Sequence, residues 1–424
     1  MSILSTQNTP FSRLHDFETI LDDAASPMTV DLVKLRELCA RGPLPNYPPF
    51  LRPRLWRLLL GSLPPEKHSW RKSDREARKR YYAIARRFLS DVESASPTTP
   101  PSANDRLLDT IFKDVSRTQP MVSFFSSLMS SGHHQRAQTP ANEEDLPPMA
   151  SRTDILVDRL RLLRGTTMIS PLFPEMAPQI MISMPDSDAY DSKHQTPHSL
   201  HDMRPLESAH SHRNALLRIL YFHSLLHPDH PYNQAMPSLL APLYFVLATQ
   251  ENDYDDSYEA EADTFWAFGE LVGDVGSVIG TVDEDQGEEG VRGLLRLFSE
   301  RLKWADEELW DQLHHKSLDP SLPYWSFRWI SCLLAQTLPL QQVIHLWDSI
   351  FSQPPESLSE HPRLTFLVDV STSMVLRLRT LLVVAGSHYK GGLWGDEVPP
   401  DDPSNRSDGT MGDGFVEGMK VLGG

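Results

Sequence analysis

An arginine stands at the end of a helical pattern in the segment IFKDVSRTQP, residues 111–120. Asp114 and Arg117 lie three positions apart, which puts both side chains on one face of a helix. The guanidinium can be a cation that the helix dipole favours near a C-terminal end. It can also be a permanently charged group that points outward toward an anion. This segment alone leaves both interpretations open.

Two later segments carry further polar residues at distinctive spacing. HPDHPYNQAMPSLLAPLYF places Tyr232 and Gln234 in a short loop, and Pro237 suits the first position of the helix that follows. We expect Tyr232 to be a packing anchor that sets the loop holding Gln234. VIHLWDSIF places Trp347 and Asp348 in a late helix. We expect structural roles for both, with Trp347 in the core and Asp348 accepting a hydrogen bond from a neighbouring helix.

The motifs of self-contained enzymes are absent from this sequence. It contains no GxxxxGK[ST], no HExxH, no GxSxG and no CxxC. Neighbouring histidines occur as His133 with His134, His210 with His212, and His314 with His315. Adjacent histidines diverge on a helix, and two of the pairs lie in polar, low-complexity segments. We therefore expect no metal site.

Composition restricts the class of protein further. The formal net charge of −17 over 424 residues argues against nucleic-acid binding. The two cysteines, Cys39 and Cys332, lie in apolar helical patterns, which indicates a reducing compartment. The N-terminal residues lack the pattern of a secretory signal. Asp369 and Arg377 interrupt the longest apolar segment, which favours a buried helix over a membrane span. We expect a cytoplasmic protein.

Basic residues concentrate between residues 51 and 90, where twelve lysines and arginines stand against three acidic residues. The segments QENDYDDSYEAEAD and DEDQGEE are acidic. Solvated helix faces explain this distribution in the simplest way. The alternative is a basic surface directed toward an anionic membrane or partner, with the protein peripheral on endomembranes.

The elements that must position these residues have helical periodicity throughout. REARKRYYAIARRFLSDV carries apolar residues three and four positions apart, and LRPRLWRLLLGSLPP ends in glycine and proline, as helices do. Thr29 can cap a helix that carries Leu32, Leu35 and Leu38. No run of alternating strands is visible. The sequence therefore predicts an all-α fold.

Taken in order, IFKDVSR, YNQAM and HLWD resemble the IxxDxxR, YxQGM and xWD motifs of the TBC domain of Rab GTPase-activating proteins. LRPRLWRLLLGSLP resembles the opening helix of that family, EADTFWAFGELV its AFWxF segment, and SLPYWSFRWISCLLAQTLPLQQVIHLWDSIF a late block. The similarity covers roughly residues 30–385. The long stretch between the arginine and glutamine motifs resembles the subgroup with a divided TBC domain.

The resemblance implies an all-α, TBC-type multi-helical domain in two helical subdomains, with disordered insertions. It further implies that Arg117 and Gln234 are catalytic fingers that enter the active site of a Rab-family GTPase in its GTP form. The partner binds Mg-GTP, so the chain needs no cofactor of its own. Asp114, one turn before Arg117, would hold the guanidinium ready. Such activators regulate vesicle trafficking.

These residue types suit the reaction that the resemblance implies. GTP hydrolysis spreads negative charge over the transferring phosphoryl group, and an attacking water must be positioned. Arginine is always protonated and presents two donors to phosphate oxygens. Glutamine offers both a donor and an acceptor, so it can orient water.

The sequence departs from the family pattern after the glutamine, where Gly-Met-Asn is replaced by Ala235-Met236-Pro237. If the glycine has a positive φ, Ala235 is strained by about 1 kcal/mol or more. Pro237 disfavours a helical Met236, and a helix N-cap is lost. These changes weaken the match to the family at Gln234 relative to the match at Arg117. They leave open a catalytically silent Rab-binding scaffold, and an α-helical adaptor unrelated to GTPases is the third alternative.

The predicted organisation has five parts. They are an N-terminal arm (1–28), an N-terminal part of the TBC domain with the arginine motif (29–130), a partly disordered, proline-rich insertion (131–210), a C-terminal part with the glutamine motif (211–388) and a flexible tail (389–424). The final GFVEGMKVLGG resembles the start of a terminal family helix.

Overall fold

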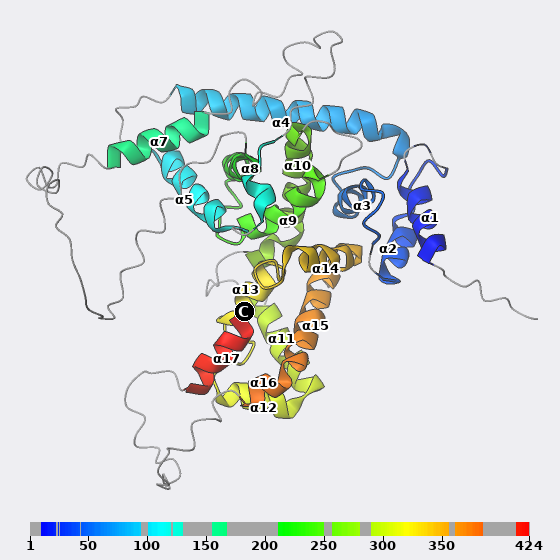
Figure 1. Ribbon diagram of the computed structural model, residues 1–424, viewed down its shortest axis with the longest axis vertical. Coiled ribbons are helices and arrows are strands. Elements are labelled where there is room, and N and C mark those ends of the chain that lie inside the picture. The colour runs from blue at the N-terminus through cyan, green and yellow to red at the C-terminus, as the bar shows by residue number, and fades with distance from the viewer. Residues whose placement is uncertain are drawn as a thin grey trace, which may run out of the picture.

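Helices make up the architecture of the computed structural model, and the described residues contain no strand, only two isolated bridges (Figure 1). The structure describes residues 10–94 except 23, 25 and 43, together with 101–119, 122–129, 155–167, 211–249, 257–279, 290–355, 361–384 and 413–423. The prediction of an all-α fold is confirmed.

The helices form two groups that lie above and below one another in Figure 1. The upper group comprises α1 (Pro10–Leu21), α2 (Leu32–Ala40), α3 (Leu51–Leu60), α4 (Trp70–Glu93), α5 (Ala103–Arg117), α7 (Ile155–Thr167), α8 (His212–Leu226), α9 (Met236–Ala248) and α10 (Ser257–Ile279). The lower group comprises α11 (Val291–Ala305), α12 (Glu307–His315), α13 (Trp325–Ser331), α14 (Leu340–Ser352), α15 (Pro362–Arg377), α16 (Arg379–Val384) and α17 (Asp413–Gly423). Helix α14 lies at the junction and packs on α2, α3, α9 and α15. The two groups agree with the expectation of two helical subdomains, and their boundary lies between α10 and α11, so the arginine and glutamine segments both belong to the upper group.

Local signals account for several helix ends. The Asp31 side chain accepts hydrogen bonds from the backbone amides of Val33 and Lys34 and caps α2. The cap expected at Thr29 is wrong, because Thr29 instead pairs with Glu66 in an isolated bridge. Asp31 is the N-cap residue, and its carboxylate accepts from both amides. Thr29 lies two residues before the N-cap position, so its side chain does not cap the helix.

Buried charges join the helices of the upper group. Arg78 of α4 donates to both carboxylate oxygens of Asp263 at 2.9 and 2.7 Å, and Arg57 of α3 lies 3.4 Å from the same carboxylate. Arg218 of α8 pairs with Glu261 at 2.7 Å, and both side chains are buried. Burial alone would raise the pKa of Asp263, but Arg57 and Arg78 hold it below its ordinary value. Part of the basic stretch is thus internal.

Two of the predicted peripheral parts contain packed structure. Within the predicted insertion, α7 packs on α4 and α5 and carries Arg159, which forms a buried 2.7 Å ion pair with Asp105. Within the tail expected to be flexible, α17 packs on α13 and α16, with Leu422 buried. The expectation of a flexible tail is therefore wrong for residues 413–423. Residues 131–154, 168–210 and 389–412 lie outside the described residues.

The N-terminal arm also carries a packed helix, and the predicted insertion begins and ends at a paired neck. Helix α1 packs on α2 and α3, with Phe17 and Leu21 fully buried. At the neck, Leu128 and Ser211 form an isolated antiparallel bridge, and the His212 amide donates to the Ser127 carbonyl at 3.1 Å. The segment that separates the arginine and glutamine motifs thus leaves and rejoins the domain at one place.

The longest apolar segment forms α15 and α16, whose inner faces are buried, as expected. Among the described residues, no helix has both the length and the apolar character needed to cross a lipid bilayer.

Two buried histidines predict that stability falls in mild acid. Burial lowers the pKa of His212 and of His223 to about 4, from an ordinary 6.5. Between these values the unfolded chain binds protons that the folded chain does not, so the free energy of unfolding falls as the pH falls through this range. We expect a loss of about 2 kcal/mol per histidine between pH 7 and pH 5. Denaturant unfolding of the wild type and of His223→Gln measures it.

The variant should show a weaker pH dependence than the wild type. The matched control is His315→Gln, because His315 is exposed on α12. Equal slopes for His223→Gln and the wild type would contradict the assignment.

Candidate functional site

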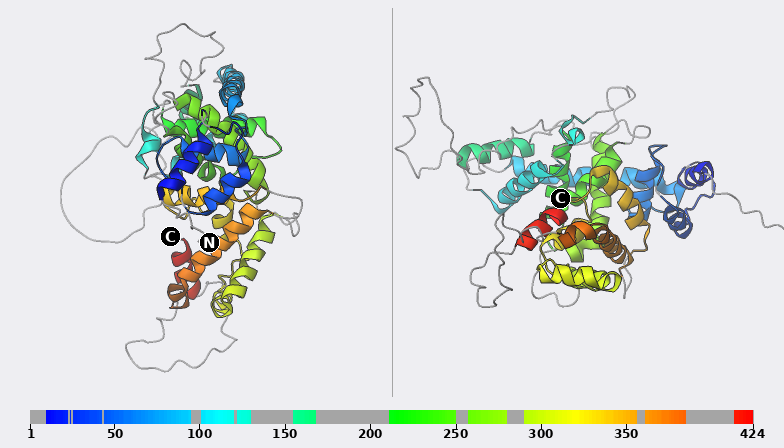
Figure 2. Two further views of the ribbon diagram at one scale, coloured as in Figure 1. Left: turned by 90° about the vertical axis from the view of Figure 1, so that its right-hand side faces the viewer. Right: turned by 60° about the horizontal axis from the view of Figure 1, so that its bottom comes forward.

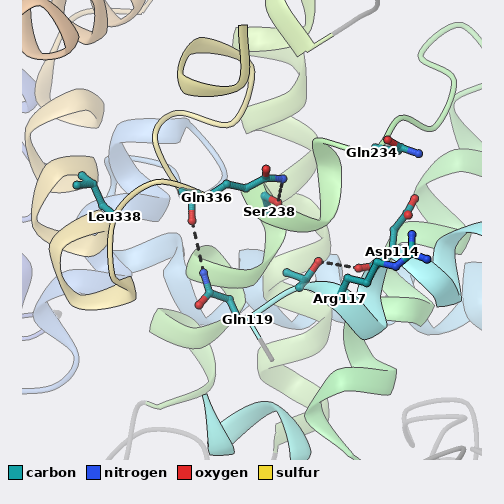
Figure 3. A pocket seen from close by; sticks show the side chains of 9 residues that line it. Asp114, Arg117, Gln119, Gln234, Ser238, Gln336 and Leu338 are labelled. Carbon is teal, nitrogen blue, oxygen red and sulfur yellow. Dashed lines mark hydrogen bonds between the residues drawn. The ribbon is translucent and has the colours of Figure 1, made fainter. Parts of the chain in front are cut away.

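A groove of about 480 Å³ brings together the two residues that the sequence singled out most strongly (Figure 3). Arg117 and Gln234 stand 117 positions apart in the chain, yet both line this groove and both are exposed. The full lining comprises Asp114, Arg117, Thr118 and Gln119 at the end of α5, Gln234 and Ser238 at the start of α9, and Ala335, Gln336 and Leu338 between α13 and α14. The expectation that the two residues share one groove is confirmed.

Arg117 is the last residue of α5, and a buried side chain holds this helix end in place. Arg213 of α8 donates from one nitrogen to the carbonyls of Val115 and Thr118, each at 2.9 Å. The Thr118 hydroxyl donates to the Asp114 carbonyl at 2.9 Å. The carbonyls at the end of a helix lack partners within the helix, so these bonds stabilise the turn that carries Arg117. Both interpretations of this arginine are therefore compatible, since it ends a helix and is exposed in the groove.

Gln234 lies in a short turn before α9, and this turn is unstrained. Ala235 has φ −78°, an ordinary right-handed value, and its amide donates to the Asn233 side chain at 2.9 Å. Met236 is helical, and Pro237 is the second residue of α9. The expectations of strain at Ala235 and of an extended Met236 are wrong. A proline in the first turn costs no helical hydrogen bond, because the amides of that turn have no partner within the helix.

A hydrogen bond links the glutamine segment to the arginine helix. The half-buried Tyr232 hydroxyl donates to the Asp114 carboxylate at 2.9 Å. Burial raises the pKa of Tyr232, and the charge of Asp114 raises it further, so the hydroxyl stays a donor. Tyr232 therefore anchors the loop that holds Gln234, as expected. The bond fixes the position of Gln234 relative to the last turn of α5.

The opposite wall of the groove contains polar residues that the sequence did not single out. Gln336 donates to the Ser238 hydroxyl at 2.8 Å, and Gln119 donates to the Ala335 carbonyl at 3.5 Å (Figure 3). Gln119 has a positive φ of 46°. No sequence signal marks these residues or Arg213, because the tertiary fold brings the segment between α13 and α14, and α8, to the end of α5.

Trp347 and Asp348 lie away from the groove, inside the junction formed by α14. Asp348 is buried and accepts hydrogen bonds from Trp56 at 2.8 Å and from Arg52 at 3.0 Å, both on α3. Trp347 is fully buried and donates to the Leu333 carbonyl at 3.1 Å. The expected hydrogen bond to a neighbouring helix is confirmed. Burial raises the pKa of Asp348, an effect that Arg52 and Trp56 oppose.

Asp348→Ala should destabilise the fold strongly. The change leaves the Arg52 guanidinium and the Trp56 ring nitrogen without their shared acceptor. Removing one partner of a buried ion pair costs about 3–5 kcal/mol in the free energy of unfolding. Denaturant unfolding measures the loss, with Asp311→Ala as the control because Asp311 is exposed on α12. A loss below about 1 kcal/mol would contradict the structural role.

The described residues contain no cluster of three or more histidine, cysteine, aspartate or glutamate side chains arranged to hold a metal ion. His314 and His315 are exposed on α12, and His212 is buried against Tyr244 at 2.8 Å. His133, His134 and His210 lie outside the described residues.

Comparison with known proteins gives concordant matches. The family model described as the Rab-GTPase-TBC domain matches residues 191–380, a segment that contains Gln234 and begins after Arg117. TBC1 domain family member 13 of Homo sapiens is 28% identical, over 88% of this chain and 90% of that protein. A TBC domain-containing protein of Schizosaccharomyces pombe is 27% identical, over 87% of this chain and 67% of that protein.

The fold is similar to a solved structure. The crystal structure of the Ypt/Rab-GAP domain of Gyp1p superposes with a TM-score of 0.55 at 18% identity, covering 88% of this chain and 87% of that chain. At this level of identity the match concerns the arrangement of helices, which agrees with the all-α architecture described above.

Proposed function

We propose that the chain is a TBC-domain Rab GTPase-activating protein and that it accelerates GTP hydrolysis by a Rab-family GTPase through Arg117 and Gln234. The observation that carries the proposal is the shared groove, in which both side chains are exposed although they come from distant segments. The GTP-loaded partner binds over this groove and supplies Mg-GTP. The setting is the cytoplasmic side of membranes in vesicle trafficking.

Each side chain has a distinct task in this mechanism. Arg117 enters the partner's active site and neutralises the charge that develops on the transferring phosphoryl group. Gln234 donates to one oxygen and accepts from the attacking water, which it orients for in-line attack. Asp114 and Tyr232 stay within this chain and do not enter the partner's active site. Their 2.9 Å hydrogen bond holds the segment that carries Gln234 against the helix end that carries Arg117.

Single-turnover GTP hydrolysis by a panel of GTP-loaded Rab proteins tests the proposal. We expect the chain to accelerate hydrolysis by at least one of them. A chain that binds GTP-loaded Rab proteins in calorimetry but accelerates none is the catalytically silent scaffold. Absence of both binding and acceleration across the panel would favour an adaptor unrelated to GTPases.

Arg213→Met should reduce activation although Arg213 lies beneath the groove. The change removes the hydrogen bonds that hold the Val115 and Thr118 carbonyls, so the end of α5 becomes less ordered. Misplacing a catalytic group costs roughly 10–100-fold in rate, and we expect the loss in the rate of the bound complex. Stimulated hydrolysis at saturating chain concentration measures it, alongside the thermal midpoint of unfolding.

Arg213→Lys keeps the charge and one set of donors, so it should restore part of the rate. Arg292→Met is the control, because Arg292 is exposed on α11. A variant that is folded and as active as the wild type would show that Arg213 does not position Arg117.

A further inference from the structure

The basic stretch between residues 51 and 90 divides into an inner and an outer set. The inner set pairs with carboxylates or carbonyls of other segments and comprises Arg52, Arg54, Arg57, Lys67 and Arg78. These residues stabilise the fold and cannot meet a ligand. The outer set lies on α4, whose inner face packs on α10 and α8.

The outer face of α4, defined here by Arg71, Lys72, Arg75, Lys79, Arg80, Arg86 and Arg87, is strongly basic. All of these are exposed except Arg86, which is half-buried. The exposed acidic residues of α4 are Glu76, which lies 3.9 Å from Lys72, and Asp91 and Glu93 in its last turn. At about 1.5 Å per residue, the basic side chains extend over about 24 Å along one helix. The whole chain carries −17, so this face differs in sign from the protein as a whole.

The position of α4 leaves its outer face accessible. The helix lies along one edge of the upper group in Figure 1 and stands at the edge again in the first view of Figure 2. None of the residues that line the groove belongs to α4. A ligand on the outer face therefore does not cover Arg117 or Gln234.

Aromatic rings order two of the outer cations. The Arg80 guanidinium lies 4.8 Å from the centre of the Trp266 ring, and that of Arg87 lies 5.9 Å from the Phe88 ring. In both cases the charged end itself lies over the ring, and Trp266 belongs to α10, so Arg80 lies on the flank of α4 that meets α10.

We propose that the outer face of α4 binds the anionic headgroups of a phospholipid membrane. The outer face presents long, exposed cations over about half the circumference of α4, and a broad convex surface of this kind matches a plane of headgroups better than a compact anion, for which a concave site is needed. The presence of a membrane near the protein rests on the proposed role in vesicle trafficking. The binding itself depends only on the basic residues of α4. A chain held in this way keeps its groove free for a GTPase on the same membrane.

Co-sedimentation with vesicles of phosphatidylcholine, with and without phosphatidylserine, tests the proposal. The wild type should bind only the vesicles that contain phosphatidylserine, and added salt should weaken binding. Arg75→Gln with Lys79→Gln should weaken it by about 25-fold, at about fivefold for each basic residue near an anionic surface. The matched control is Arg292→Gln with Arg296→Gln, a pair of exposed arginines four positions apart on α11, which should change binding by less than about twofold.

Stimulated hydrolysis with a soluble Rab, without vesicles, separates this inference from the proposed function. The α4 pair of substitutions should leave that rate unchanged. Two results would overturn the inference while leaving the proposed function intact. One is a wild type whose vesicle binding does not increase with phosphatidylserine, and the other is an α4 variant that binds these vesicles as well as the α11 control. Binding to polyglutamate through Arg75 and Lys79 without binding to vesicles would assign the face to an acidic protein and overturn it also. Vesicle binding without GTPase activation would instead overturn the proposed function alone.

Discussion

Replacement of Arg117 by alanine is expected to lower stimulated GTP hydrolysis by about 10²–10⁴ while the protein stays folded. The side chain is exposed at the end of α5, so we expect its replacement to leave the core intact. In the proposed mechanism the guanidinium acts mainly on charge that develops in the transition state. Affinity for the ground-state GTP complex should therefore change far less than the rate.

Arg117→Lys sharpens this prediction. A lysine keeps the charge but cannot donate to two phosphate oxygens in a fixed plane, so it should restore little of the rate. The control is Arg292→Ala on the exposed face of α11. Stimulated single-turnover hydrolysis and calorimetric binding, measured with one responsive Rab, give the two quantities. An Arg117→Ala protein as active as the wild type would end the arginine-finger mechanism.

Gln234→Ala is expected to lower the stimulated rate by about 10²–10³. The turn that carries Gln234 is unstrained, and the Tyr232–Asp114 hydrogen bond holds it against the arginine helix. In the proposed mechanism this side chain orients the attacking water, and neither Ala235 nor Pro237 strains the turn that holds it. Stimulated hydrolysis measures the loss, with Gln312→Ala as the control because Gln312 is exposed on α12.

The opposite result has a definite meaning. If Gln234→Ala is nearly silent while Arg117→Ala is severe, the GTPase's own glutamine positions the water. The chain would then be an activator with one finger. Comparable losses in both variants would establish the two-finger mechanism.

The sequence predicted the helices and drew attention to Arg117 and Gln234, because both inferences depend on local information. Helical periodicity determines which residues share a face, and the motif order identified Arg117 and Gln234. The sequence did not show which of the basic side chains point into the core. Arg57 and Arg78 turn inward because Asp263, about two hundred positions later in the chain, meets them in the core.

Backbone conformation at the glutamine loop was predicted wrongly for a similar reason. A glycine in a family motif does not reveal which φ the local turn requires, and at Ala235 the turn needs only a right-handed value. Arg213 was missed because its role depends on two carbonyls of another helix. The sequence around Arg213 gives no sign of these two hydrogen bonds.

The paired neck at Leu128 and Ser211 has a consequence for how this domain can change over evolutionary time. Because the chain departs and returns at one fixed point, residues added between those positions increase the length of a closed excursion and leave the distance between its ends unchanged. Each doubling of such an excursion costs only about 0.6 kcal/mol in closure entropy. Lineages can therefore add residues, or acquire new binding sequences, before or after α7, while α7 keeps its packing on α4 and α5.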